Sequence, residues 1–399
     1  MSPFLFPFLR RSSIAVALVS GLLLVAWGRE ARAYPQFQFS SGTTRCGQCH
    51  YSPSGGTLIS PWGRDEAGDT ISLGGDGSFL HGLWAPPSWL ALGADIRLAA
   101  LRNDVGGADS PELAFFPMQA DLYTRFAYDA FSLNVTLGAR GVVRPPDPSL
   151  SGRTSDVGQR MMSREHYLMW RPSATGPYVR IGRYFSPYGL RFVEHIFFVR
   201  ANTGYNLYEE TYNASYGYVD EDWEVHATAF THVPTSVPDF FGAAGPAENG
   251  GVAYGEKRFN KMAALALQTR IGIASEEARY QGGAVGKLWI EKARLLFLGE
   301  ADFIRQQFSK ANFGQSQFVS YLGATYFIRG FMLGAAYERF QEDLAVKGTG
   351  RDAYDGELNV FPWAHFELNL LMRYQTRATV APGDTPRGSL VMLQLHYYL

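Results

Sequence analysis

The sequence is poor in cysteine and has no excess of charge of either sign. Only two of its 399 residues are cysteines, Cys46 and Cys49, which excludes a disulfide framework and a four-cysteine iron–sulfur cluster. The 36 Lys and Arg residues are balanced by 37 Asp and Glu residues. Without a basic excess the chain has no electrostatic footprint for nucleic acid, and we expect no nucleic-acid partner.

Long apolar runs are absent beyond the first 33 residues. No later run approaches the roughly 20 residues of a membrane-spanning helix, which excludes a polytopic helical membrane protein. The first 33 residues contain an arginine pair, a short apolar core and the sequence Ala-Arg-Ala at positions 31–33, which has the form of a cleavage site. We therefore predict a signal peptide over residues 1–33 that is cleaved on export, with an uncleaved membrane anchor as the alternative.

The most specific motif is Cys-Gly-Gln-Cys-His at positions 46–50. It is the attachment signature of c-type haem, in which Cys46 and Cys49 bond the two vinyl groups of one porphyrin and His50 becomes the proximal iron ligand. A redox Cys-x-x-Cys motif would need a βαβ context, and a zinc site would need two more Cys or His ligands at short spacing. Neither context is present in the sequence. We predict one covalently bound haem c, a cofactor for electron transfer.

The second axial ligand of that haem is left open by the sequence. The mature chain has no methionine before residue 88, and His81 is the only other histidine in this region. If the N-terminal region completes its own coordination, the distal ligand is His81. The alternatives are a five-coordinate iron, with His81 a linker residue, or a ligand from the rest of the chain. The residues considered for that role are Met118, Met161, Met162 and His195.

The character of the sequence changes near Pro86 and Pro87. Residues 34–87 are rich in Gly, Ser and Pro and show no sustained period, and we interpret them as a small monohaem cytochrome c-like domain. About 50 residues rarely bury a core of their own, but a covalently held porphyrin would supply the missing apolar centre. Residues 88–399 alternate between apolar and polar positions, and they form the second domain.

The alternation in this second domain is typical of half-buried β-strands. In the last stretch Val391, Leu393 and Leu395 share one face, whereas Gln394 and His396 share the other. The stretches are roughly 10 to 14 residues long, against about 5 or 6 in ordinary sheets, which favours a transmembrane barrel over a soluble sandwich. The predicted strands start near Leu90, Leu113, Phe131, Ser163, Pro177, Tyr188, Glu209, Asp222, Asn260, Glu276, Lys292, Gln315, Gly330, Ala353, Trp363 and Gly388.

These features predict an all-β protein, a roughly 16-stranded antiparallel transmembrane β-barrel with a small N-terminal c-type haem domain. An even strand number places both chain ends on one side, normally the periplasmic side, and about sixteen strands leave room for an aqueous lumen. The predicted location is the outer membrane of a Gram-negative bacterium. The haem domain is expected in the barrel lumen or at its periplasmic mouth.

Charged residues of both signs are predicted to face the lumen. A ring of carboxylates could draw a hydrated cation inward, but barrel interiors ordinarily carry mixed charges, which favours a plain lining over a dedicated iron site. Residues 185–206 either fold inward and narrow the pore or form a plain loop. The predicted lumen residues are Asp121, Glu224, Glu300, Asp302, Glu338 and Glu367, together with Arg97, Arg125, Arg140, Arg294 and Arg373.

The order of these features is similar to that of one known family. An export signal, a single Cys-x-x-Cys-His motif near the mature N-terminus and a barrel resemble the fused outer-membrane monohaem cytochrome–porins, whose characterised members oxidise ferrous iron at the cell surface. The matching residues are the two cysteines and His50, and Pro-Trp-Gly-Arg at 61–64 resembles the family's Phe-Gly-Arg segment, with Trp62 in place of Phe. The likeness covers architecture over the whole chain but sequence only over about residues 33–66.

The resemblance implies an outer-membrane cytochrome that carries electrons from an extracellular reductant, with ferrous iron as the expected donor, to a periplasmic carrier. Iron:cytochrome oxidoreductase activity would then be an electron-transfer reaction without catalytic residues. We expect Trp62 to pack on the haem edge and Arg64 to pair with a propionate. The alternatives are a porin-type channel with a structural or sensory haem plug, and an oxidase or peroxidase with an open iron position.

Overall fold

The structure is a computed structural model that describes residues 35–104, 112–140, 161–206, 209–232, 247–377 and 387–399. The predicted signal peptide lies outside the described residues. Among the residues described, no helix is both long and apolar enough to cross a membrane.

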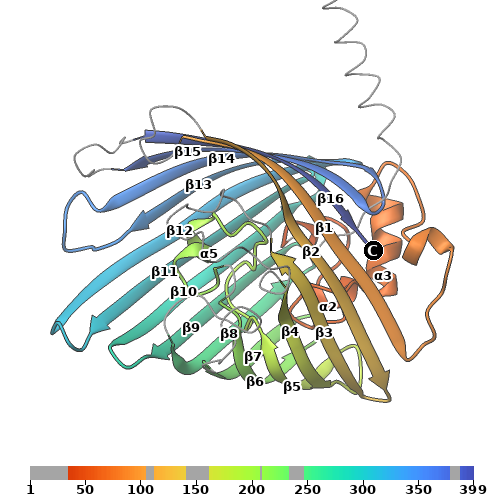
Figure 1. Cartoon of the computed structure of the whole chain (residues 1–399), viewed down its shortest axis with the longest axis horizontal. Coiled ribbons are helices and arrows are strands. Elements are labelled where there is room, and N and C mark those ends of the chain that lie inside the picture. Colours follow the sequence, from red (N-terminus) through yellow and green to blue (C-terminus); the bar gives the residue numbers. More distant parts are fainter. Residues whose placement is uncertain (1–34, 105–111, 141–160, 207–208, 233–246, 378–386) are drawn as a thin grey trace, which may run out of the picture.

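Sixteen antiparallel strands close into a barrel, because β1 pairs with both β2 and β16 and every other strand pairs with its two neighbours in sequence (Figure 1). Closure leaves no unpaired sheet edge. The predicted barrel is thereby confirmed. The strands are β1 (Leu90–Asn103), β2 (Glu112–Tyr128), β3 (Phe131–Arg140), β4 (Met161–Trp170), β5 (Gly176–Tyr184), β6 (Thr211–Val219), β7 (Trp223–Thr231), β8 (Asn249–Phe259), β9 (Ala263–Ile273), β10 (Glu277–Ile290), β11 (Leu295–Phe308), β12 (Phe313–Ile328), β13 (Phe331–Gln341), β14 (Gly350–Trp363), β15 (Phe366–Arg377) and β16 (Arg387–Tyr398).

The alternation of the sequence decides which face of the wall each side chain takes. On β16, Val391 and Leu393 are 39% and 51% exposed, whereas Gln394 and His396 are 5% and 1% exposed. The apolar rows therefore lie on the outer surface and the polar rows face the lumen. This is the arrangement expected of a barrel whose outer surface meets lipid.

The predicted strands differ from the structure at two places. The segment near Tyr188 is not a strand, and it folds into the barrel, where Tyr188 is buried. Strand β8 is missing from the predicted set, because its outward face carries Gly251, Ala253 and Gly255 in place of large apolar side chains. The predicted number of sixteen thus combines one wrong strand with one missed strand.

The two ends of the barrel differ in the length of their connections. At one end the connections are short, and residues 129–130 and 364–365 are two-residue turns. At the opposite end the connections between β5 and β6 and between β7 and β8 span residues 185–210 and 232–248. Bacterial outer-membrane barrels have short periplasmic turns and longer extracellular loops, and the same asymmetry is present here.

The N-terminal segment, residues 35–87, is called the plug below, and it lies at the short-turn end of the barrel beside the C-terminus (Figure 1). The side chain of Gln38 donates to Glu256 on β8 and accepts from Lys287 on β10, at 3.2 and 2.6 Å. Arg180 on β5 donates to the Ser52 hydroxyl at 3.0 Å. The short helices of the plug are η1 (Pro35–Phe37), α2 (Cys46–Cys49), α3 (Pro61–Glu66), η2 (Ala67–Ile71) and η3 (Phe79–Gly82).

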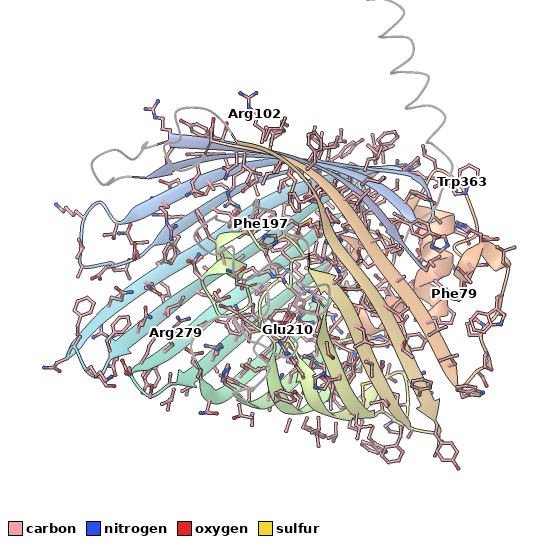
Figure 2. The ribbon with its side chains drawn as sticks, viewed as in Figure 1. Phe79, Arg102, Phe197, Glu210, Arg279 and Trp363 are labelled. Atoms are coloured by element: carbon pink, nitrogen blue, oxygen red, sulfur yellow. The ribbon has the colours of Figure 1, made fainter. Side chains whose placement is uncertain are left out.

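A second segment, residues 185–206, enters the barrel from the long-loop end and is called the lumen segment below. It leaves the wall after β5 and reaches strands on the far side of the closed sheet. The Tyr188 hydroxyl donates to Asp302 on β11 at 2.6 Å, and Arg373 on β15 donates to the Ile196 carbonyl at 2.7 Å. Its helix α5 (Phe198–Ala201) lies inside the barrel. Phe197 lies in the interior, whereas Arg102 lies at the rim (Figure 2). Of the two alternatives that the sequence left open for this segment, the structure has the inward fold.

Candidate functional site

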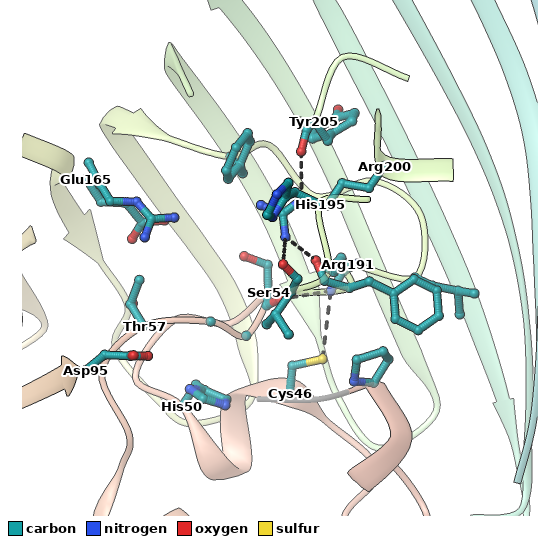
Figure 3. Close-up of a pocket in the computed structure, with 18 of the residues that line it drawn as sticks. Cys46, His50, Ser54, Thr57, Asp95, Glu165, Arg191, His195, Arg200 and Tyr205 are labelled. Carbon is teal, nitrogen blue, oxygen red and sulfur yellow. Dashed lines mark hydrogen bonds between the residues drawn. The ribbon is translucent and has the colours of Figure 1, made fainter. Parts of the chain in front are cut away.

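The plug and the lumen segment enclose a cavity of about 430 Å³ inside the barrel (Figure 3). Both cysteines and His50 line it from the plug, and Arg191 and His195 line it from the lumen segment. Residues of strands β1–β5, β10, β11 and β16 form the rest of its wall. A volume of this size lies within the range of known ligand pockets, about 300 to 1,000 Å³.

The local fold of the plug explains how the motif reaches the cavity. The four-residue helix α2 places the two cysteine thiols one turn apart. Helix α3 begins after Ser60, whose side chain accepts from the Gly63 amide and donates to the Gln48 carbonyl at 2.5 Å. A Cβ on Gly63 would lie 2.3 Å from the Cys49 carbonyl oxygen, so the close approach of α3 to α2 requires glycine here.

His50 is a buried polar residue of the plug, and its side chain has no hydrogen-bond partner in the described structure. The residue is 3% exposed, and neither ring nitrogen has a hydrogen-bond partner in the described structure. Burial lowers the pKa of His50 to about 4, and the backbone carbonyls of residues 56–58 oppose this shift only weakly. A neutral, unpaired imidazole facing a cavity has the form that a metal ligand needs.

The thiols lack the character of a redox Cys-x-x-Cys pair. Burial, with a smaller contribution from Glu224, raises the pKa of Cys46, and burial raises the pKa of Cys49 to about 12. Reactive redox cysteines instead have lowered pKa values. The raised pKa values of the two thiols therefore argue against a thiol–disulfide exchange pair.

Charged side chains surround the cavity, and most of them are paired. Arg191 has a positive φ of 61° and contacts Glu224 on β7 at 2.7 Å, the Ser54 carbonyl at 3.2 Å and the Cys46 sulfur at 3.9 Å. Two of its guanidinium nitrogens, Nε and Nη2, have no partner in the described structure. Arg191 could therefore hold a carboxylate group of a bound molecule without losing its contact with the plug.

His195 and two methionines are further donor groups at the cavity. Met118 on β2 and Met392 on β16 line it together with His195. Burial and the neighbouring Arg200 lower the pKa of His195 to about 4. His396 also lines the cavity, but it is already engaged, with Nε2 at 2.7 Å from Asp95.

The structure does not bring His81, Trp62 or Arg64 to the cavity. His81 is exposed at the outer side of the plug, where its ring lies 4.8 Å from that of His365. The Trp62 side chain is 40% exposed, and Arg64 donates to the Leu92 carbonyl at 2.7 Å. Their positions therefore give no support to the expected haem contacts of these three residues.

The predicted lumen charges are largely where the sequence placed them, and they form a mixed lining. The six predicted carboxylates are all buried, with partners such as Arg258 for Glu224 and Arg373 for Glu338. Arg294 does not follow the prediction, because it lies in the exposed turn after β10, and the side chain of Arg140 lies outside the described part of the structure. Among the described residues, no group of three His, Cys, Asp or Glu side chains could hold a metal ion.

Arg191 is one of the cavity residues that the sequence did not reveal. Its contact with Ser54 joins residues 137 positions apart, and the pattern around it does not alternate. Only the positions of Gly189 and Pro187 mark the segment as irregular in the sequence. A long-range contact of this kind has no local signal.

Comparisons with known proteins identify the fold of the chain but not its family. No family model matches the chain, and no curated protein matches it. Solved structures with a similar fold include OmpT of Vibrio cholerae (TM-score 0.57, 10% identity, 79% of this chain and 99% of that one) and the anion-selective porin from Comamonas acidovorans (0.57, 9%, 78% and 99%). Pseudomonas putida OprB is also similar (0.58, 11%, 78% and 94%). The chain therefore has the barrel fold of outer-membrane porins.

Proposed function

We propose that this protein is an outer-membrane electron conduit, a barrel that holds one covalent haem c in its lumen. The observation that carries the proposal is the position of the motif. Cys46, Cys49 and His50 all line a cavity enclosed between the plug and the lumen segment. The sequence signature and the enclosed site thus meet at one place in the fold.

The residues at the cavity fit the cofactor. The unpaired imidazole of His50 would bind the iron, and Cys46 and Cys49 would hold the porphyrin through thioether bonds. The free guanidinium nitrogens of Arg191 would pair with a propionate. When bound, the haem supplies one-electron oxidation and reduction.

The protein's own contribution is position and insulation. The plug is fixed to the wall by Gln38, Ser52 and their partners, and the lumen segment is fixed by Tyr188 and its neighbours. These contacts hold the motif inside the barrel, and a haem there would lie on the path of an electron that must cross a hydrocarbon layer about 30 Å thick. Burial and nearby charge would set the reduction potential.

The asymmetry of the connections gives the direction in which the conduit would face. The short turns and both chain ends would lie in the periplasm, and the lumen segment would come from the outer surface. Ferrous iron at the outer surface would be oxidised to ferric iron, and the released electron would pass through the site to a periplasmic carrier. Iron is the expected donor because of the resemblance to the cytochrome–porins.

A porin-type channel with a haem plug is the second candidate, and the fold likeness to porins favours it. The lumen segment argues against a wide channel, because it crosses the interior to reach β11 and β15. Solute flux through the reconstituted protein would support the channel. An oxidase or peroxidase would instead need an open iron position, which a six-coordinate spectrum would exclude.

The experiment is to express the full chain with a c-type maturation system and test for haem on a denaturing gel. We expect the wild type to keep its haem, and Cys46→Ala together with Cys49→Ala to abolish that retention. Trp62→Phe is the matched control within the plug, and it should keep the haem. Loss of the haem from the denatured wild type would contradict the proposal.

A further inference from the structure

We infer that the lumen segment supplies the second axial ligand of the haem through His195, an inference that rests on the proposed function. The first step is the choice of donors. The cavity that contains His50 is also lined by His195, Met118 and Met392, whereas His81 does not line it. A ligand opposite His50 must come from the groups that face this space.

The second step is the chemical availability of each donor. The described structure gives His195 no hydrogen bond and no ion pair, so its imidazole is uncommitted. His396 is held by Asp95 at 2.7 Å and by Glu367 at 3.5 Å. The Tyr188 hydroxyl is likewise engaged with Asp302, and the Tyr205 hydroxyl lies 2.9 Å from that of Ser186. Of these histidine and tyrosine donors at the cavity, the imidazole of His195 is the one that the described structure leaves free to bind.

The third step is the rigidity of the backbone that carries His195. On its N-terminal side, the amides of Gly189 and Leu190 donate to Gln268 and Glu300 at 2.7 and 2.8 Å. On its C-terminal side, Arg373 donates to the Ile196 carbonyl at 2.7 Å, and the Phe198 amide donates to Glu338. His195 is therefore held between two anchored stretches, as a preorganised ligand should be.

Arg200 fixes the bend of this segment from within. Its guanidinium donates to the carbonyls of Phe192 and Val193, both at 2.6 Å, and to the Tyr205 carbonyl at 2.8 Å. These contacts lie beside His195 in the close-up (Figure 3). A half-buried arginine that satisfies three backbone carbonyls is a structural brace for the turn that presents the imidazole.

The fourth step is the position of His195 relative to the motif. His50 comes from the plug at the short-turn end, and His195 comes from the segment that enters from the long-loop end. In Figure 3 the two rings lie on opposite sides of the drawn pocket, with Ser54 and Arg191 near its middle. The two axial ligands would thus join the plug to the lumen segment through one iron atom.

The test compares the visible spectra of variants of the full chain that have been matured with haem. The wild type should be six-coordinate and low-spin. His195→Ala should become high-spin with haem still covalently attached, and added imidazole should restore the low-spin spectrum. His81→Ala is the matched control, and its spectrum should stay low-spin.

A second variant covers the case in which His195→Ala fails to fold. His195→Met should stay low-spin but gain the charge-transfer band of methionine-ligated ferric haem, with a raised reduction potential. A low-spin spectrum that survives in His195→Ala without imidazole would overturn the inference, as would a change in His81→Ala, Met118→Leu or Met392→Leu alone. Any of these results would overturn the inference and leave the proposed function standing. A wild type without covalent haem would overturn both the inference and the proposed function.

Discussion

Side-chain positions are determined differently in the barrel wall and in the two segments inside it. In the wall, a period of two residues decides the position of each side chain, and the outer face needs only to be apolar. In the plug and the lumen segment, positions depend on individual long-range contacts, such as that of Arg191 with Ser54. The comparison shows that the wall supplies a generic scaffold, while the specific chemistry belongs to the irregular segments it encloses.

The largest effect should follow from removing the lumen segment. Replacement of residues 185–210 by a short turn should leave the wall intact, because β5 and β6 are already paired up to Tyr184 and Thr211. Single-channel recordings should then show a conductance well above that of the wild type, but below that of an open 16-stranded channel because the plug remains in the barrel. Shortening of residues 342–349, where Leu344 and Val346 are exposed, is the control. Equal conductance in the two variants would refute a narrowing role for the segment.

A charge introduced on the outer face of the barrel should have the next largest effect, which is a loss of stability. Leu267 on β9 is 74% exposed in the middle of its strand. Leu267→Arg should reduce the free energy of unfolding by about 2–4 kcal/mol in a bilayer, because the guanidinium would lie in hydrocarbon. Leu267→Phe, which keeps the face apolar, should change it little. Urea titration of both variants in lipid vesicles measures the difference, and equal midpoints would show that this face does not meet lipid.

A point substitution in the lumen segment should cost less stability than Leu267→Arg, and its effect should be confined to that segment. Tyr188→Phe removes the donor at 2.6 Å from Asp302, which keeps its bond from Gln268 at 2.8 Å. The expected cost is about 1–3 kcal/mol. Hydrogen exchange should quicken at the Gly189 and Leu190 amides and stay slow in the wall strands. Uniform acceleration across the whole barrel would show that the segment and the wall unfold as one unit.

The smallest effect is expected at an exposed ion pair of the wall. Lys310 and Glu276 interact near the turn after β11, and their side chains are 76% and 56% exposed. Lys310→Ala should change the free energy of unfolding by less than about 1 kcal/mol, because solvent screens the pair. A urea midpoint shifted as far as that of Leu267→Arg would contradict the ranking of the two regions.

The sequence predicted the wall well because burial repeats every second residue. The outward and inward rows of β16 and β15 agree with the alternation in the sequence. The failures have physical causes of their own. Strand β8 presents small residues outward, and the stretch near Tyr188 is apolar because it packs inside the lumen.

The candidate site was predicted only in part. The spacing of Cys46, Cys49 and His50 is a local signal, and it identified the plug side of the cavity. The other side depends on how the lumen segment folds back against β9, β11 and β15, and no local pattern encodes those contacts. His195 therefore stood in the sequence as one of several open alternatives for the distal ligand, while His81 was favoured by its closeness in sequence alone.

The central claim is tested most directly by electron transfer across a sealed membrane. The wild type is reconstituted into vesicles that hold a redox dye, and ferrous iron is added outside. The account predicts reduction of the enclosed dye by the wild type and none by the protein with Cys46→Ala and Cys49→Ala, at equal insertion. Solute swelling without dye reduction in the wild type would contradict the conduit and support a channel.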